Sequence, residues 1–183
     1  MNTEPTIRRE LRPGDLGAVV AHHGRLYARE YGVDAGFEAH VANSVARVGI
    51  RGFPREHEGI WIVEQRGEHA GSVALTDEGG GEAVLRWFVL EPRLRGRGLG
   101  RRLVGEVIAE ARAAGQTLLA LETFSELTAA AHIYRDIGFE LTWEETKPRW
   151  GRREITYQRY ELPLRAEPDP AQTPGRVPNH VGT

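Results

Sequence analysis

The 183-residue chain contains no cysteine. This absence excludes disulfide bonds, zinc sites with thiolate ligands and catalysis by a cysteine nucleophile. Lysine is almost absent too, because Lys147 is the only one, and without a Gly-Lys pair the chain cannot form a Walker A phosphate loop. No apolar run approaches the roughly 20 residues that cross a membrane. The first residues lack the basic start and apolar stretch of a secretory signal, so we expect a cytoplasmic protein with no membrane partner.

The charges are nearly balanced. There are 24 basic and 26 acidic residues, with a formal net charge of −2, so we expect neither an extended polyanion-binding face nor a nucleic-acid partner. We also expect no metal site. After position 164 the sequence becomes rich in proline and poor in large apolar residues. We therefore expect one domain over residues 1–164 and a disordered tail over residues 165–183.

A loop rich in glycine and arginine separates an apolar strand, expected at 84–90, from an amphipathic helix, expected at 99–114. Glycine lets a backbone approach a ligand closely, and the first turn of a helix offers unpaired N–H groups and a dipole that favours an anion. The loop glycines have the spacing G-x-G-x-G, which differs from the dinucleotide fingerprint G-x-G-x-x-G. We therefore predict a phosphate site of another kind.

Arg95, Gly98 and Gly100 match the pattern Q/R-x-x-G-x-G/A. This resembles motif A of the GNAT superfamily of acyl-CoA N-acyltransferases. The resemblance implies that acetyl-CoA is the co-substrate, with its pyrophosphate held by loop amides and its acetyl end near the close of the preceding strand. The cofactor-binding residues expected on this basis are Val89, Leu90, Arg95, Gly96, Arg97, Gly98, Gly100 and Arg101.

A second motif spans residues 127–139. Tyr134 lies on the apolar face of a predicted helix that ends at Gly138-Phe139, and this resembles the GNAT helix with the ending Y-x-x-x-G-F. The resemblance implies that Tyr134 protonates the leaving thiolate, and the alternative is that it only packs in the core. Leu127 stands where many members of the family have an asparagine that contacts the cofactor.

The expected element order is β-αα-βββ-α-β-α-ββ over about residues 6–164, which is also the GNAT order. The fold class is therefore α+β with a mixed central sheet. The strands at 84–90 and 118–123 should be parallel because a helix connects them. The resemblance further implies that these two strands splay apart and leave backbone groups free for the cofactor.

The first helical region resembles a GNAT subgroup often fused behind a MarR-type DNA-binding domain. The resemblance rests on His22-His23-Gly24-Arg25-Leu26-Tyr27, on Glu30-Tyr31-Gly32 and on Phe37-Glu38. We expect no such domain in this protein, so DNA binding is not transferred. His23, Tyr27 and Tyr31 follow one another at four-residue spacing and are predicted to line the acceptor site, with Tyr27 and Tyr31 binding substrate. The alternative is an ordinary amphipathic helix.

An amine must lose a proton before it attacks a thioester. The candidate bases are His23, Glu30, Glu64 and Glu122, and His23 is favoured because its ordinary pKa suits the task. The sequence thus predicts an N-acetyltransferase that passes an acetyl group directly to a primary amine of a small molecule or protein. The expected partners are a small-molecule or peptide amine and, as an open alternative to the monomer, a second copy in a homodimer. The alternatives are a non-catalytic acyl-CoA sensor of the same fold and a nucleic-acid-binding module. The acceptor and the acyl chain length stay open.

Overall fold

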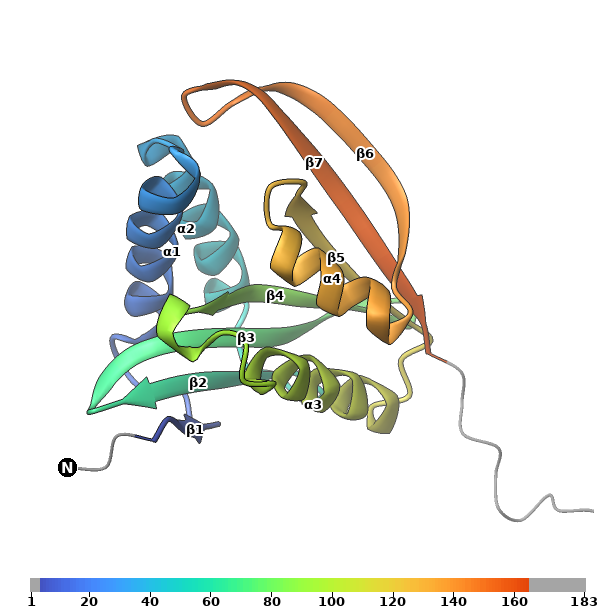
Figure 1. Cartoon of the computed structure of the whole chain (residues 1–183). Helices are drawn as coiled ribbons and strands as arrows, with labels where there is room; N and C mark the ends of the chain where they lie inside the picture. Colours follow the sequence, from blue (N-terminus) through green and yellow to red (C-terminus); the bar gives the residue numbers. More distant parts are fainter. Residues whose placement is uncertain (1–3, 165–183) are drawn as a thin grey trace, which may run out of the picture.

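The computed structural model describes residues 4–164 (Figure 1), so the predicted tail at 165–183 lies outside the described residues. The element order is the predicted one. In chain order the elements are β1 (Thr6–Arg8), α1 (Asp15–Tyr31), α2 (Ala35–Ile50), β2 (Gly59–Gln65), β3 (Glu68–Gly79), β4 (Glu82–Leu90), the short 3-10 helix η1 (Pro92–Leu94), α3 (Leu99–Ala113), β5 (Leu118–Phe124), α4 (Thr128–Ile137), β6 (Glu140–Arg149) and β7 (Arg152–Pro163).

One seven-stranded sheet, in the order β1-β2-β3-β4-β5-β7-β6, forms the centre of the domain. Every neighbouring pair is antiparallel except β4 and β5, which are parallel as predicted. Each face of the sheet carries its own apolar core. Residues of α3 and α4 pack on one face and residues of α1 and α2 on the other (Figure 1). The α+β class and the mixed sheet are confirmed.

The parallel pair separates halfway along its length. Pairing runs only from Glu82 opposite Leu118 to Leu85 opposite Leu121, although β4 continues to Leu90 and β5 to Phe124. An irregularity in the β3–β4 register begins at the same point, and Trp87 there has a left-handed φ of 52°. A bulge of this kind bends its strand away from a neighbour. The splay predicted from the family resemblance is therefore present.

The β6–β7 hairpin reaches over the ends of α1 and α2 (Figure 1). The backbone N–H of Asp34, between the two helices, donates to the Trp150 carbonyl at 2.9 Å. The Arg152 guanidinium, just after the hairpin turn, donates to the Tyr31 carbonyl at 2.9 Å. These bonds fix the hairpin turn against the α1–α2 connection, more than a hundred residues away in the chain.

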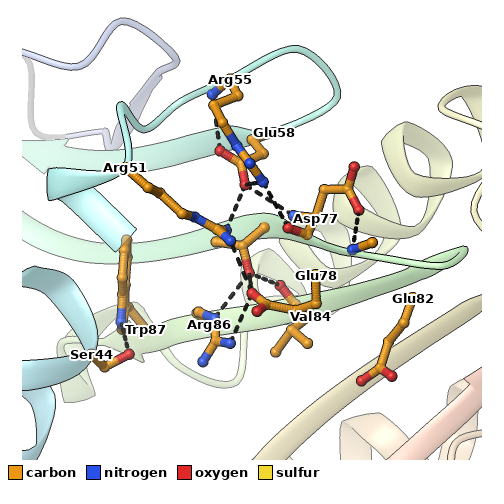
Figure 2. A network of polar contacts seen from close by, with 12 residues as sticks. Ser44, Arg51, Arg55, Glu58, Asp77, Glu78, Glu82, Val84, Arg86 and Trp87 are labelled. Carbon is orange, nitrogen blue, oxygen red and sulfur yellow. Dashed lines mark hydrogen bonds and ion pairs between the residues drawn. The ribbon is translucent and has the colours of Figure 1, made fainter. Parts of the chain in front are cut away.

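A buried carboxylate ties the end of α2 to the central strands. The Glu58 side chain is 0% exposed and accepts from the guanidinium groups of Arg51 at 2.7 Å and Arg55 at 3.1 Å. It also accepts from the backbone N–H groups of Arg55 and Asp77 (Figure 2). Burial by itself raises the pKa of Glu58, but these hydrogen bonds and the Arg51 charge outweigh it and leave the pKa below its ordinary value.

We expect Glu58→Gln to lower the free energy of unfolding at pH 7 by about 2 kcal/mol, because the bonds to charged arginines lose their charged acceptor. The lowered pKa of the folded state means that Glu58 contributes stability above its ordinary pKa of 4.5 and loses it as the pH falls through the folded value. Urea denaturation at pH 7 and at pH values below 4 should therefore show the gap between wild type and variant narrowing in acid. Glu56→Gln, at a side chain 89% exposed, is the control and should change little. A gap that stays constant with pH would contradict the assignment.

Candidate active site

A cavity of about 360 Å³ lies beside the free end of β4, between the glycine loop and α4. Gly98 is the N-cap of α3 and provides no side chain to cap it, so the first N–H groups of α3 have no side-chain acceptor at the cap. These donors and the helix dipole favour an anion. The cavity lining comprises Tyr27, Tyr31, Phe88, Val89, Leu90, Arg95, Gly96, Gly98, Gly100, Arg101, Leu127, Ala129, Ala130, His132 and Ile133.

Two loop glycines are required for different reasons. Gly98 has φ 79°, a left-handed conformation that strains other residues, yet a Cβ there would meet nothing within 4 Å. Gly100 has no such backbone demand, but its Cβ would lie 3.1 Å from Ile133 and 3.3 Å from Phe88. Gly98 therefore sets the turn and leaves open space above it, whereas Gly100 lets α3 pack closely against α4 and β4.

Most loop arginines are already paired. Arg95 donates to the Leu90 carbonyl at 2.9 Å and to Glu30 on α1 at 3.0 Å. Arg101 is paired with Asp136. Arg97 is exposed and is not among the residues that line the cavity. An anion bound here is therefore met mainly by backbone amides and the helix dipole, and the pairing neutralises much of the basic patch that a nucleic-acid-binding module would need.

A second cavity, of about 270 Å³, lies between α1, α2, the free half of β5 and the hairpin turn. It shares Tyr27, Phe88, Leu127 and Ala130 with the first cavity. Two ligands could therefore meet between the splayed strands. Leu127 leaves this junction apolar where an asparagine is common in the family.

Tyr134 lies on α4 with its side chain buried, and it lines the second cavity. Its ring packs against Phe139 at 5.7 Å and Tyr160 at 6.1 Å between centroids. Within residues 4–164 its hydroxyl has no hydrogen-bond partner. Burial raises the pKa of Tyr134, so the hydroxyl stays protonated at neutral pH. The residue thus belongs to the core and also presents an unused donor to the cavity.

The three residues predicted on α1 do not all line the same cavity. His23 lines the second cavity, and its Nδ1 lies 2.8 Å from the Val19 carbonyl. Its burial lowers the pKa to about 4. Tyr27 lines both cavities and donates to the Phe88 carbonyl at 3.4 Å, whereas Tyr31 lines only the first.

The other three candidate bases are also separated. Glu30 is paired with Arg95, and Glu64 is paired with Arg8 at 2.8 Å and lines neither of these cavities. Glu122 lines the second cavity and accepts from the Tyr157 hydroxyl at 3.0 Å. Of the four candidates, only His23 and Glu122 therefore face the place where an acceptor would bind.

Sequence reasoning missed a polar stripe on α2. Its members recur at spacings of three and four residues and face the second cavity beside the apolar stripe of the same helix. That spacing is visible in the sequence. One member, Ser44, accepts from the Trp87 indole N–H at 3.1 Å. The stripe consists of His40, Asn43, Ser44 and Arg47.

A splayed parallel strand pair, a helix start without a side-chain cap and two joined cavities are the arrangement expected of an acyl-CoA-dependent transferase. The Acetyltransferase (GNAT) family matches residues 25–139, and the chain belongs to this family. It is an acyltransferase with acetyl-CoA as donor. Residues 4–164 contain no group of His, Asp and Glu side chains that could hold a metal ion. In the same range no helix has the length and apolarity needed to span a membrane.

Several named proteins align with this chain over most of its length. The L-amino acid N-acyltransferase MnaT of Escherichia coli (strain K12) is 27% identical over 169 residues, which is 86% of this chain and 95% of MnaT. The structure of yncA from Salmonella typhimurium with its cofactor acetyl-CoA aligns with a TM-score of 0.63 at 20% identity, over 91% of this chain and 99% of that one. The ribosomal-protein-S18-alanine N-acetyltransferase of Escherichia coli aligns with a TM-score of 0.63 at 24% identity, over 91% and 98%. The two structural likenesses show the fold.

Proposed function

We propose that the protein transfers an acetyl group from acetyl-CoA directly to the primary amine of a small molecule, without an acyl-enzyme. The observation that carries this proposal is the junction of the two cavities between the splayed strands. A thioester entering from the glycine loop and an amine entering from the second cavity would meet there. Relatives act on an L-amino acid or on a ribosomal protein, and the second cavity, roofed by the fixed hairpin, favours a small molecule.

The cofactor residues fit this role. Bound acetyl-CoA supplies an acetyl group activated as a thioester. The amides of Gly96, Gly98 and Gly100 would hold its pyrophosphate, because they lie where α3 begins without a side-chain cap. Backbone groups of Val89 and Leu90 lie on the unpaired half of β4 and would hydrogen-bond the acyl arm. Contributions from the Arg95, Arg97 and Arg101 side chains are part of the same proposal.

In the reaction the amine nitrogen forms a bond to the acetyl carbon, and the bond from that carbon to sulfur breaks. A protonated acceptor first gives one proton to a base. During attack the nitrogen loses a second proton, which replaces the one that Tyr134 gives to the departing thiolate. The raised pKa of Tyr134 keeps its hydroxyl protonated, so this donor is present at neutral pH. His23 is the base that its residue type favours, through Nε2, since Nδ1 faces the Val19 carbonyl. With its pKa lowered to about 4, however, His23 holds an accepted proton weakly. Glu122 in the same cavity is the second candidate.

A panel of primary amines scored by release of free CoA tests the function. We expect acceptor-dependent release for at least one class of small amine, together with a rise in melting temperature on addition of acetyl-CoA. Stabilisation by acetyl-CoA with no release for any amine would support the sensor alternative. Binding to DNA or RNA with a steep salt dependence, and none to acetyl-CoA, would support the nucleic-acid alternative.

Three finer predictions belong to the same proposal. They are a cytoplasmic location, a homodimer and similarity to the GNAT subgroup found behind MarR-type domains.

A further inference from the structure

The second cavity holds two charged side chains of opposite sign that do not pair with each other. Arg47, on α2, and Glu122, on β5, both line it. Within residues 4–164, neither has an ion-pair partner, and both are solvent-exposed at the cavity. Glu122 accepts from the neutral Tyr157 hydroxyl, and its charge also acts on His40 in the same cavity, whose pKa burial lowers so that the ring stays neutral at pH 7. The second cavity is therefore lined by one cation and one anion that have no ion-pair partner within residues 4–164.

The other arginine that lines this cavity, Arg86, is already paired within the protein. Arg86 is paired with Glu78 at 3.0 Å and donates to the Thr76 hydroxyl at 2.9 Å (Figure 2). Its charge is thus matched by a carboxylate of the protein. Arg47 is therefore the arginine in this cavity that can be neutralised by a ligand, and Glu122 is the carboxylate that can.

Glu122 is placed to hold an amine near the thioester. It follows Leu121, the last residue of β5 that pairs with β4, so it lies where the strands begin to separate. Leu121 belongs to the core on the α3 and α4 side, and side chains alternate along a strand. Glu122 therefore projects to the α1 and α2 side, which is the side of the acceptor cavity.

Aromatic rings form a further part of the lining of the second cavity, called here the ring wall. Phe37 packs on Trp150 with ring centroids 4.9 Å apart, and Phe124 lies 5.9 Å from Trp150. Tyr157 continues the wall at 6.0 Å from Trp150. All four rings line the cavity. Such a wall favours an apolar or aromatic group and offers little to a strongly solvated one.

We infer, on the basis of the proposed function, that the acceptor is a free amino acid or a close analogue. Its ammonium group would bind Glu122, its carboxylate would bind Arg47, and an apolar or aromatic side chain would lie on the ring wall. A zwitterion neutralises both charges at once, whereas a simple amine leaves Arg47 unmatched. Arg47 is then a specificity-determining residue that contacts the part of the acceptor away from the reacting nitrogen.

Matched acceptor pairs test this inference. Each L-amino acid with an apolar or aromatic side chain is compared with its own amide, which keeps the amine and side chain but lacks the carboxylate. We expect kcat/KM to favour the acid by about thirtyfold in the preferred pair, as for the loss of a charge-assisted hydrogen bond. Equal rates for acid and amide would overturn the inference.

Arg47→Gln provides the second arm. It should raise KM for the preferred amino acid by about tenfold or more, with little change for the amide, and Arg47→Lys should recover part of the loss. Arg112→Gln, at an exposed arginine of α3 that lines neither cavity, is the matched control and should leave both acceptors unchanged. Equal losses for acid and amide in Arg47→Gln would contradict a role in carboxylate binding.

If simple amines release CoA but no amino acid does, this inference fails and the proposed function stands. If no amine of either kind does, the proposed function itself fails.

Discussion

Replacing Tyr134 with phenylalanine should lower kcat by about a hundredfold or more while leaving acetyl-CoA affinity nearly unchanged. The ring keeps its packing against Phe139 and Tyr160, and only the hydroxyl is lost. Because that hydroxyl has no partner within residues 4–164, its removal breaks no internal hydrogen bond. The measurement is single-turnover CoA release, in which the chemical step is observed directly.

Tyr160→Phe is the matched control for this change. Tyr160 is buried in the same aromatic group, but it lines neither cavity and its hydroxyl donates to Gln158 at 3.5 Å. We expect its turnover to stay close to that of the wild type. Near-normal turnover in Tyr134→Phe as well would leave Tyr134 as a packing residue, with the thiolate protonated by water.

Glutamate at Gly98 should abolish most acetyl-CoA binding. The substitution places a carboxylate at the start of α3, where a pyrophosphate would lie, and like charges repel there. In wild type, acetyl-CoA at a hundred times its dissociation constant should add about 2.7 kcal/mol to the free energy of unfolding. We expect Gly98→Glu to lose nearly all of this gain, measured as the thermal shift on adding acetyl-CoA.

The backbone strain of that substitution needs its own control. Gly14 is the N-cap of α1 and has φ 97°, and a Cβ at this position, as at Gly98, would meet nothing within 4 Å. Gly14→Glu therefore introduces a comparable left-handed glutamate at a helix start that lines neither cavity. It should lower the basal melting temperature and keep the full shift with acetyl-CoA. Equal shifts for wild type and Gly98→Glu would remove the glycine loop from the site.

The sequence predicted the features that depend on neighbours in the chain. The element order follows from hydrophobic periodicity, and Gly138 ends α4 as expected, with its N–H bonded to the carbonyls of Tyr134 and Arg135. The loop at 95–100 stands out because its glycines are closely spaced. Each of these features is local, so a short window of sequence contains its cause.

The remaining features depend on residues that are distant in the chain. The pairing of Arg95 with Glu30 joins positions 65 residues apart, and nothing in either segment specifies the other. The bulge at Trp87 arises from the register between β3 and β4 rather than from a turn residue. The role of Arg47 could not be predicted from the sequence for another reason. The apolar stripe of its helix shows which face packs on the core. The face that lines the cavity depends on how α2 packs on the sheet.

The position of β7 in the sheet determines the order in which parts of the protein can fold during synthesis. Within residues 4–164, β7 is the last strand in sequence, and it lies inside the sheet between β5 and β6, so β6 has no strand to pair with until β7 has been synthesised. On the ribosome, the elements that line the first cavity, which end with α4, can assemble while β5 still presents an open edge. An open edge is a known hazard for intermolecular strand pairing. The second cavity needs Trp150 and Tyr157, which are synthesised after all the residues that line the first cavity. A nascent chain can therefore complete its cofactor loop before it has an acceptor site.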